Sequence, residues 1–252
     1  MPFSLYYLYH SGFALCFDDF TVLIDYFEDS KDAEHGIFHE QLLQRPGTLY
    51  VLSSHFHQDH FNPLIFDFLE QKEDLRYILS KDIYKKRKKW LPVDDIAFLS
   101  AGDTYADQHL SIKAFGSTDV GVSFYFEAGG HKFFHAGDLN NWHWQDESTP
   151  EESAGYEKLF LVELKKIKAE LPGLDVVMFP TDPRLGSDYL RGPRQFIEAI
   201  PSKVLLPMHF DMEYAKANAM KEQAARAGTA FVELTARGEG FAFADDLSFR
   251  KI

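Results

Sequence analysis

Short apolar runs separated by polar turns dominate the first half of the chain. The runs are rich in aromatic and β-branched residues, which favour extended structure, and several alternate apolar with polar positions. Gly129 and Gly130 form a hairpin-turn signal between the last two runs. The pattern therefore predicts strands at residues 4–10, 13–19, 21–27, 110–116, 121–129 and 131–138, the first three as a meander.

Helical and fully apolar segments lie between these groups of strands. The run "TLYVLSS" at 48–54 has the length and composition of a buried strand. Pro63 opens a helical stretch, and a basic helix follows further along the chain. The predicted elements are helices at about 36–45, 63–71 and 82–90 and strands at 48–54, 76–80 and 95–100.

The second half of the chain mixes longer helices with buried strands. Thr149, Pro150 and Glu152 form a capping box with proline at the first helical position, which predicts a helix to about Glu170. Gly228 is a helix stop signal. The remaining predicted elements are helices at 192–200 and 212–228 and strands at 174–180, 203–209, 229–233, 240–244 and 247–250.

These elements predict one α/β (α+β) domain over residues 1–252. With 252 residues, 45% of them hydrophobic, the chain is long enough to bury a substantial core. Each half combines strands with helices, and no repeat or linker separates the halves. We therefore expect two sheets packed face to face with helices outside.

Charge and cysteine content narrow the expected partners and compartment. With 39 acidic and 26 basic residues the formal charge is −13, which disfavours a nucleic-acid partner. The single cysteine, Cys16, allows no internal disulfide, as suits a reducing cytoplasm. No apolar stretch approaches the ~20 residues of a membrane span. We expect a cytoplasmic protein that binds a small molecule and no membrane; a homo-oligomer is compatible with the sequence.

Coordinating side chains are concentrated where the strand at 48–54 ends. His55, His57, Asp59 and His60 fall within six positions. Imidazole and carboxylate groups at this spacing suit a site for zinc, iron or manganese. The alternative to a metal site is a hydrogen-bonded polar turn. Such a loop needs ligands from other segments to complete a second metal site. Two further candidates, Asp138 and His209, each follow an apolar strand, and open α/β sheets present their sites at such strand ends.

The segment "HFHQDH" at 55–60 resembles the HxHxDH signature of the metallo-β-lactamase-fold hydrolases. Gly137-Asp138 and His209 are similar to that family's downstream bridging aspartate and terminal histidine, and Asp25 to a structural aspartate behind the metal loop. Within the family, "YHSGFAL" and "FHAGD" resemble the cytosolic lactonase-like and uncharacterised hydrolases. The resemblance implies a four-layer αββα sandwich with metals at one edge.

The resemblance also implies a role for each ligand. His55 and His57 would bind the first metal, Asp59, His60 and His209 the second, and Asp138 would bridge them. The family's third histidine for the first metal is missing, because the corresponding segment reads "AFGSTDVGVSF" at 114–124. Three explanations remain open: Asp119 ligates instead, His143 from "NNWHW" swings in, or the first site is weak or empty. Asp182 is a further possible contributor.

The chemistry implied is hydrolysis by a metal-bound hydroxide, since a bound cation lowers the pKa of water from ~15.7 to ~7. Asp59 would orient this nucleophile and His143 would assist the leaving group. We predict cleavage of a small, anionic ester, lactone or phosphoester with one or two Zn²⁺ ions, or with manganese or iron. The alternatives are a phosphodiesterase or nuclease of the same fold and a metal-binding sensor without turnover.

Several other residues have two interpretations. Trp142 and Trp144 either line a substrate pocket or pack in the core. The basic run at 84–89 is expected to be a solvated helix face. Arginines that could fix a phosphate or carboxylate follow the strand at 174–180. They are Arg184, Arg191 and Arg194. We expect His10 and His135 to be buried, hydrogen-bonded histidines.

Overall fold

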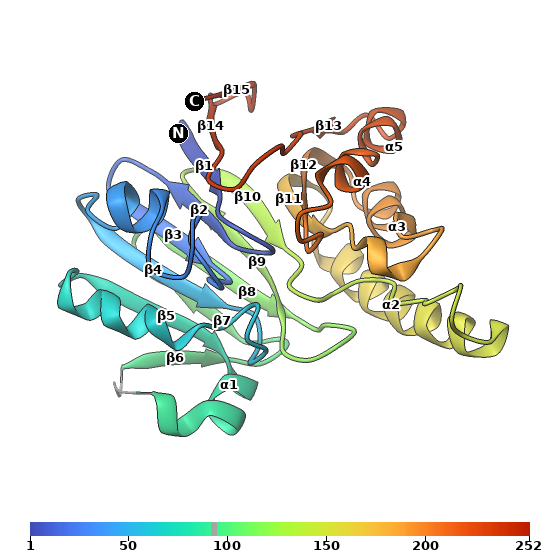
Figure 1. The fold of residues 1–252 in the computed structure, drawn as a ribbon, viewed down its shortest axis with the longest axis horizontal. Helices are drawn as coiled ribbons and strands as arrows, with labels where there is room; N and C mark the ends of the chain where they lie inside the picture. Colours follow the sequence, from blue (N-terminus) through green and yellow to red (C-terminus); the bar gives the residue numbers. More distant parts are fainter. Residues whose placement is uncertain (92–94) are drawn as a thin grey trace.

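Two mixed β-sheets face each other and carry helices on their outer faces, in the predicted four-layer sandwich (Figure 1). The computed structural model describes residues 1–91 and 95–252. Among these residues the first sheet has eight strands in the order β15-β14-β1-β2-β3-β4-β5-β6, and the second has seven in the order β13-β12-β11-β10-β9-β8-β7.

The first sheet contains β1 (Phe3–Tyr7), β2 (Phe13–Cys16), β3 (Phe20–Ile24), β4 (Thr48–Ser53), β5 (Leu75–Ser80), β6 (Ile96–Leu99), β14 (Gly240–Phe243) and β15 (Phe249–Lys251). The second contains β7 (Thr104–Ala106), β8 (Leu110–Phe115), β9 (Ser123–Ala128), β10 (His131–His135), β11 (Leu174–Pro180), β12 (Ser202–Met208) and β13 (Ala230–Phe231). The antiparallel meander β1-β2-β3 and the β9-β10 hairpin form as predicted.

Helices cover both outer faces. On the first sheet these are η1 (Phe38–Leu42), η2 (Pro63–Glu70), α1 (Lys81–Arg87) and η3 (Lys88–Trp90). On the second sheet they are α2 (Pro150–Glu170), α3 (Arg191–Ala199), α4 (Tyr214–Asn218) and α5 (Lys221–Arg226), and the short turn η4 (Pro183–Leu185) follows β11. Among the described residues no helix combines the length and the apolar character needed to cross a membrane.

Apolar side chains fill two spaces, one between the sheets and one outside the first sheet. Aromatic residues of both sheets interlock between them: Phe3 stacks on Phe243 at 4.7 Å between ring centroids and meets the ring of Phe133 edge-on at 5.2 Å. A second cluster, including Val51 and Phe68, lies under η1, η2 and α1. Burial on both faces explains why β4 reads as a continuous apolar run.

Parallel pairing brings several strand ends to one edge of the sandwich. Strands β3 to β6 run parallel to one another, and so do β10 to β13. The carboxyl ends of β4, β10, β11 and β12 lead directly into the segments that contain the predicted metal ligands. The fold therefore assembles residues distant in sequence at one edge.

The helix predicted at 212–228 is wrong as a single element. It is divided into α4 and α5 around Ala219 and Met220. The Asn218 side chain donates to the Leu234 carbonyl and accepts from the Leu234 N–H, which ties the end of α4 to the segment beside it. This side-chain pairing competes with continued helix and lets the Met220 side chain be fully buried.

Two other predictions need correction. The helix expected at 36–45 is the five-residue turn η1, whose start is held by the buried Asp29 carboxylate accepting from the N–H groups of Phe38 and His39. Strand β7 was not predicted, because its short polar sequence is mostly exposed at the edge of the second sheet. The capped helix at 150–170 forms as predicted, including both hydrogen bonds of the capping box.

Candidate metal centre

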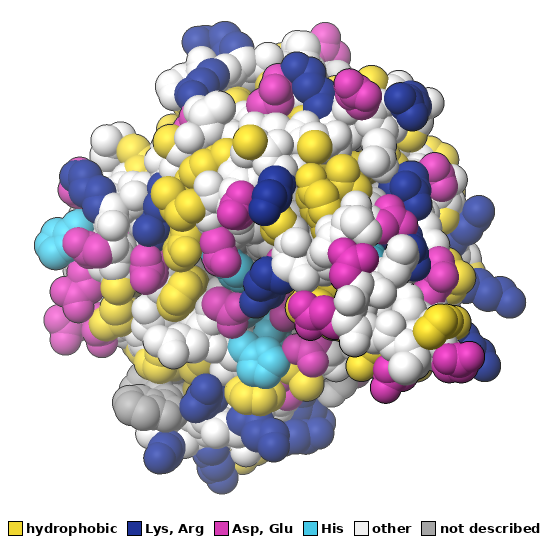
Figure 2. Space-filling view, turned by 45° about the vertical axis from the view of Figure 1, so that its right-hand side comes forward, with side chains coloured by type: hydrophobic (Ala, Val, Ile, Leu, Met, Phe, Trp, Pro, Cys, Tyr) yellow, Lys and Arg dark blue, Asp and Glu magenta, His cyan; other side chains and the backbone are white. Residues whose placement is uncertain are grey.

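Five segments from both sheets converge on one site. They are the β1–β2 turn with His10, the loop after β4 with residues 55–60, the β8–β9 loop with Asp119, the segment after β10 with Asp138, and the residue after β12, His209. In the space-filling view, histidine side chains lie among acidic side chains near the centre of this face (Figure 2).

A buried aspartate shapes the loop after β4. The Asp25 carboxylate accepts from the Ser54 N–H at 2.7 Å and from the Ser54 hydroxyl at 2.6 Å. Its Oδ2 also lies 2.7 Å from Nδ1 of His60. Asp25 thus lies behind the loop and orients the His60 ring so that Nε2 points the other way, into the site.

The first group of potential ligands is His55, His57, Asp119 and Asp138, whose ligand atoms all lie within 4.8 Å of one another. Nε2 of His55 is 3.4 Å from Oδ2 of Asp138, and Nδ1 of His57 is 3.4 Å from Oδ2 of Asp119. Asp119 therefore occupies the place where a third histidine was expected. Of the three explanations for that missing histidine, the geometry favours replacement by this carboxylate.

The second group is His10, Asp59, His60 and His209, within the same 4.8 Å limit. The Nε2 atoms of the three histidines all face Oδ2 of Asp59. The distances are 3.2 Å from His10, 3.8 Å from His60 and 3.8 Å from His209. His10 is buried and its Nδ1 is hydrogen-bonded to Oδ1 of Asp211 at 3.0 Å, as predicted from the sequence, and its Nε2 also joins this group.

Asp138 lies between the two groups. Its Oδ2 faces His55 of the first group, whereas its Oδ1 lies 3.1 Å from Nε2 of His60 and 3.3 Å from Nε2 of His209. A carboxylate with one oxygen directed at each group has the arrangement needed to bridge two cations, which is the role expected for Asp138 from the sequence.

The donor atoms of these groups fit a bound cation. The Nε2 atoms of His10, His55 and His60 and Oδ1 of Asp138 are buried without a hydrogen-bond partner. Buried polar atoms are normally paired, and imidazole nitrogen and carboxylate oxygen are ligands for zinc, manganese and iron. Each group thus contains potential metal ligands that have no hydrogen-bond partner. A divalent cation bound in each group would satisfy them.

The electrostatics of the site keep its carboxylates ionised. Burial would raise the pKa of Asp59, but its contact with His10 and the nearby His60 and His209 hold that pKa below the ordinary range. Burial opposes ionisation of Asp138 as well, and His60 and His209 lower its pKa well below the usual value. Ionised carboxylates are the form that binds metal.

Two predicted site residues lie outside both groups. Asp182 is behind His209: its Oδ2 lies 3.0 Å from Nδ1 of His209, so it supports that ring from the side away from the site. Burial would raise the pKa of Asp182, but hydrogen bonds with His209 and Arg184 lower it to about 2.

His143 does not reach the site. Its Nε2–H donates to the Asp188 carbonyl and its Nδ1 accepts from the Gln145 N–H, both at 3.0 Å. Both ring nitrogens therefore have backbone partners, which leaves neither for a metal or a leaving group. Sequence reasoning could not detect this, because the direction of the ring depends on the fold of residues 139–150.

A pocket of about 370 Å³ opens above the two groups. Trp142 and Trp144 line it, with their rings stacked at 6.2 Å between centroids, and the Trp142 indole donates to the Asp138 carbonyl at 2.9 Å. Of the two interpretations of these tryptophans, the geometry favours the pocket wall. Arg184, Thr118 and Tyr156 also line the pocket.

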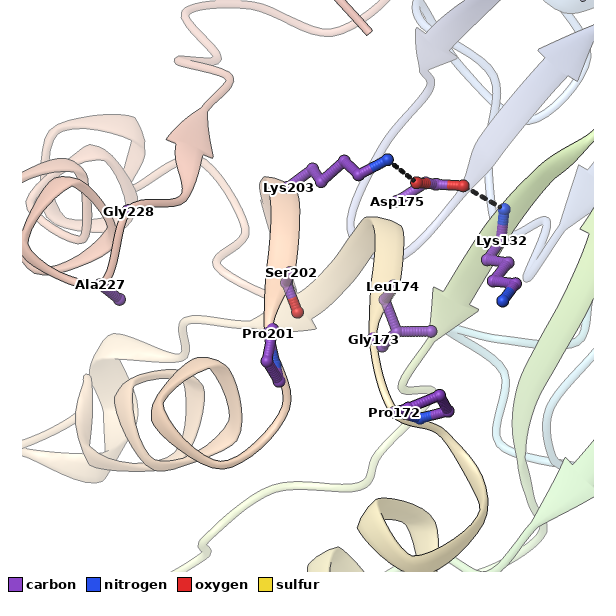
Figure 3. Close-up of a pocket in the computed structure, with 10 residues that line it drawn as sticks. All are labelled: Lys132, Pro172, Gly173, Leu174, Asp175, Pro201, Ser202, Lys203, Ala227 and Gly228. Atoms are coloured by element: carbon purple, nitrogen blue, oxygen red, sulfur yellow. Dashed lines mark hydrogen bonds and ion pairs between the residues drawn. The ribbon is translucent and has the colours of Figure 1, made fainter. Parts of the chain in front are cut away.

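A larger depression of about 660 Å³ lies at the other ends of β10 to β12 (Figure 3). Asp175 occupies its rim, where it pairs with Lys203 at 2.8 Å and accepts from the Lys132 N–H. Asp175 and Lys203 therefore neutralise each other, and the depression contains none of the potential metal ligands. Its size alone does not make it the functional site.

No model of a known protein family matches the sequence, and no curated protein matches it either. Solved structures do resemble it. The metallo hydrolase Igni18 from Ignicoccus hospitalis has a TM-score of 0.67 at 16% identity, over 97% of this chain and 99% of that one. The metallo-β-lactamase-fold protein YhfI from Bacillus subtilis has a TM-score of 0.61 at 11% identity, over 96% and 99%.

A third similar structure is the diiron β-hydroxylase CmlA from Streptomyces venezuelae. Its TM-score is 0.66 at 13% identity, over 100% of this chain but 54% of that one. The three proteins share an arrangement of strands and helices with this chain at low sequence identity. Together with the two-sheet topology and the metal-ligand groups at its edge, these comparisons show that the chain has the metallo-β-lactamase fold.

Proposed function

We propose that this protein is a metal-dependent hydrolase that cleaves a small, anionic ester, lactone or phosphoester. The observation that carries the proposal is the pair of ligand groups, joined by Asp138, at the base of a pocket with aromatic walls. The formal charge of −13 argues against a nuclease, because it works against binding a phosphate backbone.

The two groups would each hold one divalent cation. His55, His57 and Asp119 would bind the first, and Asp59, His60 and His209 the second, with Asp138 shared. We propose zinc, because imidazole-rich sites suit it, while the carboxylates of the first group also suit manganese or iron. When bound, the cations supply Lewis acidity toward the scissile group and a hydroxide nucleophile near neutral pH.

Asp59 is the candidate for orienting the attacking water. Its side chain is 36% exposed and lines the pocket, while Oδ2 faces the histidines of the second group. The histidine contacts hold it ionised, so that it can accept a hydrogen bond from the water. In this mechanism Asp59 orients the water before its attack on the carbonyl or phosphoryl centre.

Arg184 is the candidate for binding the anionic part of the substrate. Its guanidinium lines the pocket and its side chain is 57% exposed. Asp182 holds Nε and Nη2 of this guanidinium at 2.9 Å and 2.5 Å, which fixes its orientation. A fixed guanidinium suits a carboxylate or phosphate oxygen, and the Trp142–Trp144 wall suits an apolar or planar part of the same molecule.

Metal analysis and a substrate panel test the proposal together. Protein purified without chelator is expected to retain at least about one zinc, manganese or iron ion per chain. It should hydrolyse members of a panel of lactones, carboxylic esters and phosphoesters, and His57→Ala should abolish the activity. In the same panel, Arg184→Gln should raise KM for anionic substrates more than for neutral ones of similar size.

The other outcomes identify the alternatives. If the protein retains its full metal content but hydrolyses no member of the panel, the result would support a metal-binding sensor without turnover. RNA cleavage that is lost in His57→Ala would support the nuclease instead. A chain that retains no metal and shows no hydrolysis after addition of Zn²⁺ or Mn²⁺ would refute the enzyme proposal altogether.

A further inference from the structure

His10 lies in the turn between β1 and β2, far in sequence from the HxHxDH loop. Its side chain is 5% exposed. Nδ1 lies 3.0 Å from Oδ1 of Asp211, and Nε2 lies 3.2 Å from Oδ2 of Asp59. This buried Nε2 makes no well-aligned hydrogen bond, and the Asp59 carboxylate is the group that it faces. A histidine that served only as core packing would not direct an unpaired nitrogen at a carboxylate in a ligand cluster.

All three histidines of the second group share one arrangement. Each has an aspartate at Nδ1 and directs Nε2 toward Asp59. The Nδ1 distances are 3.0 Å from His10 to Asp211, 2.7 Å from His60 to Asp25, and 3.0 Å from His209 to Asp182. A carboxylate on the far nitrogen is the usual support of a metal-binding histidine, because it fixes the tautomer and the ring orientation. In this respect His10 resembles His60 and His209.

The backbone around His10 is held in an uncommon conformation. His10, His209 and Asp211 have φ values of 55°, 59° and 51°, in the left-handed region that residues other than glycine seldom adopt. The His209 N–H donates to the His10 carbonyl at 3.0 Å, and the two rings lie 4.1 Å apart. Such conformations persist where the surrounding structure enforces them, and here they place Nε2 of both histidines against Asp59.

We propose that His10 is a ligand of the second cation, which is then bound by three imidazoles and the Asp59 carboxylate, with Asp138 still shared between the two cations. The site would select a borderline transition-metal ion such as Zn²⁺ over Mg²⁺ or Ca²⁺, which prefer oxygen ligands. The inference rests on the metal binding assumed in the proposed function, but not on the substrate or the reaction. The competing explanation is that His10 only orients Asp59 through a hydrogen bond.

Zinc binding by His10→Gly tests the proposal. Glycine suits the left-handed backbone at this position and removes the whole side chain. Chelator-treated wild type and variant are titrated with Zn²⁺ by calorimetry, and the retained metal is counted by elemental analysis. We expect the variant to hold about one ion fewer after dialysis. Its zinc affinity at the second site should fall by more than ~100-fold, which is the largest loss expected when only a supporting residue outside the ligand set is removed.

Cobalt provides a readout that separates ligation from orientation. In Co²⁺-loaded protein, loss of an imidazole ligand changes the visible absorption bands of the second site, whereas loss of a hydrogen bond to Asp59 leaves the ligand set intact. Free imidazole added to Co²⁺-loaded His10→Gly should enter the vacated space and restore the wild-type spectrum. Restoration by imidazole but not by a similar amount of pyrrole would identify the missing group as a coordinating nitrogen.

Two further variants provide controls. Asp211→Asn keeps the ligand but removes the supporting carboxylate, so zinc affinity should fall by about 10- to 100-fold, less than in His10→Gly. His39→Ala removes a histidine whose Nδ1 also pairs with an aspartate, Asp29 at 2.9 Å, but which lies outside both groups. It should leave zinc stoichiometry and the cobalt spectrum unchanged.

The outcomes distinguish failure of this inference from failure of the proposed function. If wild type binds two ions and His10→Gly binds two with unchanged affinity and spectrum, His10 is not a ligand, although the enzyme proposal stands. If wild type binds no ion, both fail. Folding of His10→Gly is checked by circular dichroism of the metal-free protein. If this variant does not fold, His10→Asn replaces it, because asparagine also tolerates the left-handed backbone. Zinc affinity equal to that of wild type in His10→Asn would also refute the proposal.

Discussion

At the scale of single residues, one glycine permits the β8–β9 loop to pack against the loop after β4 that contains His55 and His57. Gly121 has a φ of 73°, and a Cβ there would lie 2.1 Å from the Ser54 carbonyl and 2.4 Å from Cβ of His55. The contact brings the loop that carries Asp119 beside the loop that carries His55 and His57. Any side chain at Gly121 would force these two loops apart.

We predict that Gly121→Ala destabilises the fold by several kcal/mol and weakens zinc binding at the first group. The matched control is Gly102→Ala, because Gly102 also has a positive φ, 93°, but nothing lies within 4 Å of its Cβ position. That variant should lose only the conformational penalty, about 1–2 kcal/mol. Urea unfolding with and without Zn²⁺ measures both effects, and equal losses in the two variants would contradict the close-packing explanation.

The sequence indicated which side chains the fold brings together better than it indicated the residues that support them, and metal binding by these side chains stays a prediction. The spacing in "HFHQDH" and the strand-end positions of Asp138 and His209 were sufficient to select them. For Asp182 and His143, position alone could not tell whether a side chain points into the site or behind it; that depends on hydrogen bonds to His209 and to the backbone at Gln145 and Asp188.

At the scale of elements, short helical turns depend on polar side chains that hold their ends. The buried Asp29 carboxylate holds the start of η1: it accepts from the backbone N–H groups of Ser30, Phe38 and His39 and lies 2.9 Å from Nδ1 of His39. Burial alone would raise the pKa of Asp29, but the hydrogen bonds from His39 and the other two residues lower it. The ionised carboxylate therefore stabilises the folded state.

The lowered pKa sets the sign of a pH dependence. A carboxyl whose pKa is lower in the folded than in the unfolded state contributes stability above its unfolded pKa, ~3.9 for aspartate, and loses it as the pH falls through the folded value. We predict that the difference in unfolding free energy between wild type and Asp29→Asn is largest near pH 7 and shrinks below about pH 4. Urea unfolding from pH 7 to pH 3 measures this difference, and one that grows on acidification would refute the assignment.

Element prediction succeeded where local signals were strong and failed where tertiary contacts decided. The capping box at Thr149 and Glu152 defined the start of α2 correctly. The division between α4 and α5 arises from hydrogen bonds between Asn218 and Leu234, sixteen residues apart, which no local pattern reveals. Length and composition alone favoured a continuous helix there.

At the scale of the whole molecule, each ligand group draws residues from both sheets. In the first group, His55 follows β4 of the first sheet and Asp138 follows β10 of the second. In the second group, His60 follows β4 and His209 follows β12. A cation in either group would connect the two layers of the sandwich as well as complete the site.

We therefore predict that metal binding stabilises the entire fold. A ligand that binds only the folded state adds about 2.7 kcal/mol when its free concentration is 100 times Kd. Zn²⁺ should raise Tm with concentration, and a chelator should lower it; Mg²⁺ at the same concentrations should have little effect. An unchanged Tm across the Zn²⁺ series, with binding verified by calorimetry, would show that the sheets do not depend on the cation.

The pairing of His10 with Asp211 has a consequence for biosynthesis. The two residues are 201 positions apart, so a ribosome delivers one near the beginning of this chain and the other long afterwards. The second ligand group cannot exist in a nascent chain until β12 and the residue after it have emerged and docked against the first sheet. If this group binds a cation as proposed, its capture is a late event in maturation, and ribosome-bound fragments that stop before β12 should acquire no ion there.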